Sequence, residues 1–186
     1  IILMMTLTAC NQNNLYESKT FSVSADKVVQ GEFSAQALSP TQITSNYRSD
    51  YKVPTKREVF FKFSLNGGDN ERFPGEDHRL LILGDELQLT SALYVFGEPD
   101  PKEVIAQKKP LEINLKNDIS VTFRCDMRTV LKALESKGSF VTKTGETIKK
   151  DKFEGLYIAG STLPLTWEFA ALTSRPEFEM KDEDND

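Results

Sequence analysis

The stretch Ile119-Ser-Val-Thr-Phe-Arg-Cys-Asp126 decides the fold that we expect for this chain. Its apolar residues alternate with polar ones, so that Ile119, Val121, Phe123 and Cys125 lie on one face. A period of two residues is typical of a β-strand that is buried on one side. We therefore predict a strand here, with Cys125 packed inward as a small hydrophobic residue.

A short helix is predicted directly after this strand. The next apolar residues are spaced three and four apart, as on one face of a helix: Met127, Val130, Leu131 and Leu134. Asp126 precedes them and can cap the first turn. Gly138 is a natural helix stop, because glycine adopts the left-handed conformation without a Cβ clash.

The same alternation recurs along the rest of the chain, broken by turn residues. Residues 59–65 form the clearest example, and Asn66-Gly67-Gly68 follows them with strong turn chemistry. Further short strands are expected at 21–25, 33–37, 80–83, 87–96, 111–115 and 153–160. We expect the first two of these to pair with each other. The fold class that this pattern predicts is mainly β, an antiparallel β-sandwich that is immunoglobulin-like or starch-binding-like, with one short helix.

Two domain organisations fit this pattern. In the first, residues 19–116 form one β-sandwich domain and residues 117–186 form a second, which lacks its last strands at the C-terminal end. The boundary is placed at Asn117-Asp118, where one alternating run stops and another begins. In the second organisation, the whole chain is one continuous sandwich.

The N-terminal segment resembles the end of a bacterial lipoprotein signal peptide. Residues 1–7 are mostly apolar. Leu7-Thr8-Ala9-Cys10 resembles the bacterial lipobox, in which the signal peptidase cleaves directly before the cysteine. The resemblance implies that residues 1–10 are a signal peptide without its start, ending at a lipidated Cys10. Residues 11–18 would be a tether, and the protein would be exported and lipid-anchored in the cell envelope. An ordinary secretory signal or a buried N-terminal segment is the alternative.

The charge distribution argues against a nucleic-acid partner. Six of the 28 acidic residues but only one of the 23 basic residues lie in 177–186, so the remaining chain carries 22 of each and is neutral. Binding to nucleic acid needs a basic surface that neutralises phosphates.

One histidine and two cysteines also argue against a zinc site. Membrane contact would come from the lipid alone.

Trp167 and Tyr157 are the candidate residues for binding carbohydrate. A flat aromatic ring can stack on the apolar face of a sugar, and Trp167 is the only tryptophan. The alternative is that Trp167 fills the core, since large aromatic side chains usually bury most of their area.

A family resemblance supports the carbohydrate hypothesis over residues 119–186. It rests on Val121-Thr-Phe-Arg-Cys-Asp-Met127, Leu156-Tyr-Ile-Ala-Gly-Ser161, Trp167 and the acidic residues 180–186. Together they resemble the start of a starch-binding-type β-sandwich module, which implies binding of a polysaccharide such as an α-glucan. The chain departs from that family at residues 162–166, where the family is usually rich in Asn and Gly.

A second resemblance covers more of the chain. Phe61-Lys-Phe-Ser-Leu-Asn-Gly-Gly-Asp-Asn-Glu71, with Gly75-Glu-Asp-His78, is similar to the N-terminal region of secreted bacterial glycoside hydrolases of the glycogen-debranching and trehalase type. In those proteins the catalytic acids lie in a helical barrel downstream. The resemblance therefore implies no catalytic residue in this chain, and it leaves open whether the full-length protein is a glycoside hydrolase.

The C-terminal carboxylates raise the question of a calcium site. Asp182, Asp184 and Asp186 have the spacing of the first half of a calcium-binding loop. The glycine and the glutamate that complete such a loop are missing, so we favour a solvated acidic tail that binds no cofactor, with Ca²⁺ as the alternative.

A cluster of four acidic residues and one histidine surrounds Pro74-Gly75. It comprises Asp69, Glu71, Glu76, Asp77 and His78. A glycosidase needs two carboxylates at a defined separation, which proximity in sequence does not supply. We therefore expect a solvated loop and no catalytic residue.

Two functions follow from these observations. The first is a non-catalytic N-terminal part of an exported glycan-processing lipoprotein, which binds or positions a polysaccharide or oligosaccharide for a downstream glycosidase domain. The alternative is a non-enzymatic surface lipoprotein that serves as a protein-interaction or adhesion module.

Overall fold

The computed structural model describes residues 14–36 and 44–182, with the side chains of residues 30–50 left aside. The β-strands are β1 (Leu15–Glu17), β2 (Phe21–Val23), β3 (Asp26–Gln36), β4 (Thr44–Pro54), β5 (Glu58–Leu65), β6 (His78–Leu81), β7 (Gln88–Val95), β8 (Ile119–Asp126), β9 (Ser139–Val141), β10 (Thr147–Lys149), β11 (Leu156–Gly160) and β12 (Glu179–Asp182). The α-helices are α1 (Lys102–Ile105), α2 (Arg128–Lys137) and α3 (Phe169–Leu172), and the 3-10 helices are η1 (Lys150–Lys152) and η2 (Pro176–Phe178).

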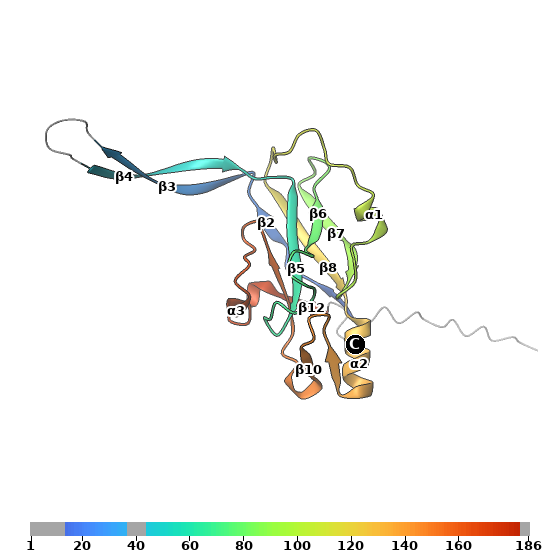
Figure 1. The fold of residues 1–186 in the computed structure, drawn as a ribbon. Helices are drawn as coiled ribbons and strands as arrows, with labels where there is room; N and C mark the ends of the chain where they lie inside the picture. Colours follow the sequence, from blue (N-terminus) through green and yellow to red (C-terminus); the bar gives the residue numbers. More distant parts are fainter. Residues whose placement is uncertain (1–13, 37–43, 183–186) are drawn as a thin grey trace, which may run out of the picture.

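The body of the molecule is built from one curled sheet of eight strands (Figure 1). Its order is β2-β8-β1-β12-β11-β5-β6, and β7 pairs with the other side of β8. All these neighbours are antiparallel except β7 and β8, which are parallel. The prediction of a mainly β, sandwich-like fold is confirmed.

The strand predicted at residues 119–126 is β8, which pairs with three other strands of the sheet. It pairs with β1 and β2 along one edge and with β7 along the other. Its alternating residues Val121, Phe123 and Cys125 are buried as predicted. Cys125 is a free thiol, and its burial raises its pKa well above the ordinary value.

The core is a cluster of aromatic rings around Phe61. Its ring centroid lies 4.7 Å from that of Phe123, 5.0 Å from that of Tyr94 and 5.5 Å from that of Phe63. Phe123 follows residue 117 and the other three precede it, so one core contains residues from both predicted domains. The sheet also joins them, because β5 pairs with β11. One core and one sheet therefore contain residues from both sides of the predicted boundary.

Helix α2 begins and ends where the sequence predicts. The Asp126 carboxylate accepts a hydrogen bond of 3.0 Å from the backbone N–H of Arg128, in the first turn. Gly138 follows the helix with a φ of +71°, in the left-handed region. The buried residues of α2, Val130 and Leu134, belong to the predicted apolar face.

Residues 111–115 do not form the predicted strand. Only an isolated bridge between Lys56 and Asn114 occurs there. Leu111 and Ile113 are exposed, while Leu115 alone is buried. The apolar residues alternate in this segment, but Leu111 and Ile113 have no sheet face to pack against, so the alternation does not indicate a strand here.

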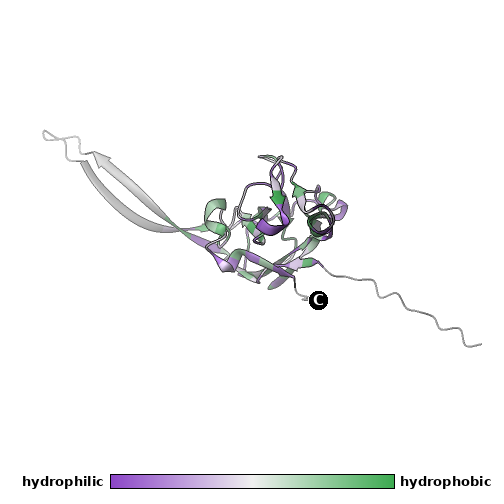
Figure 2. Ribbon diagram, turned by 90° about the horizontal axis from the view of Figure 1, so that it is seen from below, coloured by the Kyte–Doolittle hydropathy of each residue, from purple (hydrophilic) through white to green (hydrophobic). Residues whose placement is uncertain are grey.

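A two-stranded arm projects from the body (Figure 1). Strands β3 and β4 pair with each other from Asp26–Pro54 to Gln36–Thr44. The predicted pairing of 21–25 with 33–37 is therefore wrong, since β2 pairs with β8 instead. Seen from below, the body from which the arm extends carries both hydrophobic and hydrophilic segments (Figure 2).

Candidate functional site

The arm leaves the body where two strands of the main sheet meet it. Strand β3 begins three residues after the end of β2, and β5 begins four residues after the end of β4. Among the described strands, β3 and β4 have only each other as hydrogen-bonded neighbours. A two-stranded ribbon on its own is marginally stable in water. Packing against a further surface would therefore stabilise an arm of this length.

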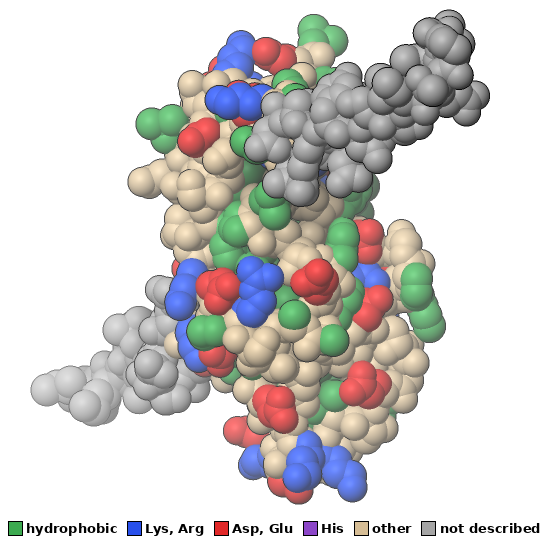
Figure 3. Space-filling model, turned by 90° about the vertical axis from the view of Figure 1, so that its left-hand side faces the viewer, with side chains coloured by type: hydrophobic (Ala, Val, Ile, Leu, Met, Phe, Trp, Pro, Cys, Tyr) green, Lys and Arg blue, Asp and Glu red, His purple; other side chains and the backbone are tan. Residues whose placement is uncertain are grey.

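A groove of about 910 Å³ lies at the base of the arm. The first residues of β3, the last of β4, the start of β5 and the loop 161–165 line it. Three of its apolar side chains are open to solvent: Val28 is 62% exposed, Leu163 63% and Phe60 38%. Figure 3 shows hydrophobic side chains at the surface directly below the arm.

The alternation of β5 explains why Phe60 faces outward. Its neighbours Val59 and Phe61 point into the core and are buried. The backbone of Phe60 is held by Ser161, whose hydroxyl accepts from the Phe60 N–H at 3.0 Å. The Ser161 N–H in turn donates to the Phe60 carbonyl at 2.8 Å. Phe60 is therefore fixed at the wall of the groove.

The charged residues that line the groove balance one another. Asp26 and Glu58 are acidic, and Lys27 and Lys56 are basic. Glu58 also accepts a hydrogen bond of 2.7 Å from Lys109, outside the groove. The groove thus combines an apolar surface with no net charge of its own.

The two predicted carbohydrate-binding residues are in different environments. Trp167 keeps 38% of its surface exposed, and its ring lies 6.1 Å from that of Phe169. Tyr157 is only 7% exposed, because it belongs to β11 in the middle of the sheet. Neither residue lines the groove. Trp167 therefore offers a surface to a ligand, and Tyr157 offers very little.

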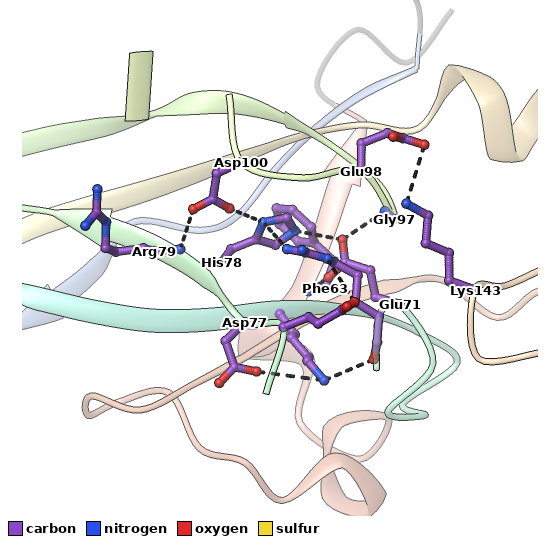
Figure 4. A network of polar contacts seen from close by, with 12 residues as sticks. Phe63, Glu71, Asp77, His78, Arg79, Gly97, Glu98, Asp100 and Lys143 are labelled. Atoms are coloured by element: carbon purple, nitrogen blue, oxygen red, sulfur yellow. Dashed lines mark hydrogen bonds and ion pairs between the residues drawn. The ribbon is translucent and has the colours of Figure 1, made fainter. Parts of the chain in front are cut away.

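The residues of the predicted loop cluster divide into buried and exposed ones. Glu71 and His78 are completely buried, whereas Glu76 is exposed. The two nitrogen atoms of His78 lie 2.9 Å from Glu71 and 2.7 Å from Asp100 (Figure 4). Glu71 also accepts hydrogen bonds from the backbone N–H groups of Phe63 and Gly97, at 2.7 and 3.0 Å. The expectation of a solvated loop is wrong for Glu71 and His78.

This polar network joins the loop after β5 to the rest of the sheet. Lys62 is also buried and donates to Asp69 at 3.0 Å and to the carbonyl groups of Arg72 and Phe73. Because the Glu71 and His78 side chains have no exposed surface, a substrate cannot reach them in this conformation. The network therefore stabilises the loop after β5 against the sheet.

The remaining predicted sites lie mostly outside the described residues. Cys10, Asp184 and Asp186 are not described, while Asp182 is the last residue of β12. Within 14–36 and 44–182, no group of three or more His, Cys, Asp or Glu residues is arranged to hold a metal ion. In the same ranges, no helix has the length and apolar character needed to cross a membrane.

The sequence analysis missed the arm and the groove. The signal available was weak: the arm strands carry many polar residues, so a half-buried alternation does not mark them. The exposed residues Val28, Phe60 and Leu163 belong to three separate segments that only the fold brings together. No family model matches this chain, and neither the curated proteins nor the solved structures contain a significant match to it.

Proposed function

We propose that this chain is a non-catalytic protein-binding module of an exported, lipid-anchored cell-envelope protein. In this proposal the β3–β4 arm and the groove at its base contact the partner. The observation that carries it is the arm itself, whose strands pair only with each other among the described strands.

The groove gives this contact an apolar centre. Val28, Phe60 and Leu163 expose hydrophobic surface at one place, next to the root of the arm. Exposed apolar surface that is rimmed by polar residues is typical of a protein-interaction site. A partner that covers both the arm and the groove would bury these side chains and support the ribbon.

Site-specific photo-cross-linking in cells that produce the protein tests this proposal. A photoreactive phenylalanine analogue replaces Tyr51, which is exposed on β4, or Leu111, which is fully exposed away from the arm. We expect one defined protein adduct from position 51 and none from position 111. Equal labelling at both positions, or no protein adduct at position 51, would contradict the proposal.

The lipid anchor is a separate part of the proposal. It rests on the resemblance of Leu7-Thr8-Ala9-Cys10 to a lipoprotein cleavage motif. We expect tritiated palmitate to label the protein when it is expressed with a complete signal peptide, and we expect Cys10→Ser to abolish the label. Labelling that persists in Cys10→Ser would exclude this anchor.

The second candidate function is polysaccharide binding, as in the non-catalytic part of a glycan-processing protein with a downstream glycosidase domain. The exposed ring surface of Trp167 favours it. Affinity electrophoresis in gels that contain α-glucan tests it, with Trp167→Ala compared with Phe73→Ala, another exposed aromatic residue. Retardation that Trp167→Ala removes and Phe73→Ala preserves would support it. Equal mobility of all three proteins would refute α-glucan binding through Trp167.

A further inference from the structure

The curled sheet is closed at the end away from the arm and has a gap between β2 and β5 near the arm. Strands β1, β12, β11 and β5 are hydrogen-bonded in succession at the closed end, where Tyr16 pairs with Asp182 and Leu156 with both Met180 and Leu65. Toward the arm, β2 has taken the place of β1 beside β8, and no described strand lies between β2 and β5. The two sides meet again at the root of the arm, where the N–H of Thr55 donates to the carbonyl of Ala25 at 2.7 Å. The groove occupies this opening.

One wall of the opening is an unpaired edge of β2. Ser120 of β8 donates its N–H to Leu87, on the β7 side. Because backbone groups alternate along a strand, the N–H and C=O groups of Ile119 and Val121 point to β2 and pair with Val23 and Phe21. The backbone groups of Ser22, between them, must point away from β8. They face the groove that Ser22 lines.

The opposite wall is an unpaired edge of β5. Arg57 accepts a hydrogen bond from Ile82 and so faces the β6 side of the strand, while Phe60 bonds to Ser161 and faces the β11 side. By the same alternation, the backbone of Glu58 points to the β11 side. Strand β11 ends at Gly160, which pairs with Phe61, so it does not reach Glu58. The backbone groups of Glu58 therefore also face the groove.

From these two edges we infer that an extended segment of a partner protein inserts as a β-strand into the opening between β2 and β5. This inference rests on the proposed function and deepens it, because it names the kind of element that the partner supplies. Backbone N–H and C=O groups at a free sheet edge bind an extended peptide by forming the missing ladder. The inserted strand would continue the sheet beside Ser22 and would have Glu58 on its other side.

The lining of the groove selects the chemistry of the segment. Val28, Phe60 and Leu163 offer contacts to apolar side chains. The two acidic and two basic residues of the lining cancel, so a strongly charged peptide gains no net attraction. The geometry therefore favours an uncharged strand in which β-branched or aromatic residues alternate with small polar ones.

Selection of peptides from a random phage-displayed library on the whole chain provides the probe. We expect the selected peptides to show this alternation, and the amides of Ser22 and Glu58 to exchange with deuterium more slowly when such a peptide is bound. Failure to select any peptide, or unchanged exchange at both amides, would overturn the inference.

Substitutions at Ser22 separate its backbone from its side chain. Ser22→Pro removes the edge N–H, which is not used in pairing with β8, and should weaken peptide binding about three- to tenfold. Ser22→Ala keeps the N–H and should bind as the parent does. Equal affinity of both variants and the parent would contradict strand insertion at β2.

A second variant, at the rim of the groove, tests the same inference in case Ser22→Pro fails to fold. Leu163→Asp places a charge at the groove and should weaken binding about tenfold or more, while Leu111→Asp changes a fully exposed residue elsewhere and should not. If position 51 cross-links to a protein but the groove variants bind peptide normally, the arm proposal stands and the strand insertion fails. If position 51 gives no adduct, the proposed function itself fails.

Discussion

The imidazole of His78 and the carboxylate of Glu71 form a buried pair, with 2.9 Å between Nε2 and Oε1 and no exposed surface on either side chain. Removing the Glu71 carboxylate leaves the buried His78 with Asp100 as its one remaining acidic partner, and it disturbs the hydrogen bonds that the N–H groups of Phe63 and Gly97 donate to Glu71. We predict that Glu71→Gln lowers the free energy of unfolding by about 3–5 kcal/mol. Urea denaturation followed by circular dichroism measures this loss.

Glu76→Gln is the matched control for this substitution. Glu76 is exposed, and its carboxylate lies 3.9 Å from Arg72, so we expect its loss to change stability by less than about 1 kcal/mol. Similar losses from both variants would show that the buried pair has no special role.

His78 should make stability depend on pH. Burial lowers the pKa of His78, but the hydrogen bonds and charges of Asp100 and Glu71 outweigh it, so the pKa is raised above its ordinary value of 6.5. Arg72, whose guanidinium lies 3.5 Å from Nδ1, is the nearby cation. A raised pKa means that the folded state binds the proton more tightly than the unfolded chain. This contribution to stability is complete below about pH 6.5 and is lost as the pH rises through the raised pKa.

The chain has one histidine, so an NMR titration of the imidazole reports on His78 directly. We expect its midpoint to lie above pH 6.5 in the folded protein. The stability difference between the parent and His78→Gln should shrink as the pH rises. A midpoint at or below 6.5, or a difference that grows with pH, would contradict this prediction.

Arg57 ties the root of the arm to two neighbouring segments. Its Nε donates to the carbonyl of Asn114 at 2.9 Å, and its other nitrogen atoms donate to Gly84 and to the Asp85 carboxylate. Lysine cannot reproduce this forked geometry. We predict that Arg57→Lys lowers the free energy of unfolding by about 1–3 kcal/mol. Thermal denaturation checks it, with Lys109→Gln as an exposed control that should have little effect.

Gly160 is predicted to tolerate no side chain. A Cβ there would lie 2.7 Å from Cδ1 of Leu165 and 2.9 Å from the backbone oxygen of Phe60. The backbone of β5 cannot move aside cheaply, so Gly160→Ala should cost about 1–3 kcal/mol. It should also disturb the groove, which Phe60 and Leu165 line.

Gly138 provides the comparison, since it has a φ of +71° and open space around its Cβ position. Gly138→Ala should cost about 1 kcal/mol through backbone strain alone and leave peptide binding at the groove unchanged. Denaturation and peptide titration of both variants distinguish the two cases. If Gly138→Ala weakened peptide binding and Gly160→Ala did not, this account of Gly160 would be wrong.

The local elements could largely be read from the sequence, because their signals are local. The alternation of residues 119–126 gives β8, and Gly138 marks the end of α2. The arrangement of the strands could not be read in the same way. The pairing of β5 with β11 joins residues nearly a hundred positions apart, and nothing within either strand specifies its neighbour.

The candidate site was less predictable than the fold. Trp167 is open to solvent, as a ligand-binding residue must be, but Tyr157 has the same aromatic character and is buried in β11. Composition alone does not separate these two cases. His78 and Glu71 were expected in a solvated loop, yet they are buried, and the His78 ring packs 5.3 Å from that of Phe61 and 4.9 Å from that of Tyr94. Its partner Asp100 comes from a segment 22 positions away. The groove could not be predicted, because the unpaired backbone edges beside it are not marked by any particular residue type.

The run of chain from Asn14 to Ala25 has a mechanical consequence. Asn14 accepts from Met127 at one end of β8, and Ala25 donates to Asp118 at the other end, roughly 30 Å away along the strand. A pull between the residues before Asn14 and the arm is therefore transmitted along one extended backbone segment. Phe21 lies on this segment and its ring centroid is 6.3 Å from that of Phe123, so tension along the segment also acts on the aromatic core.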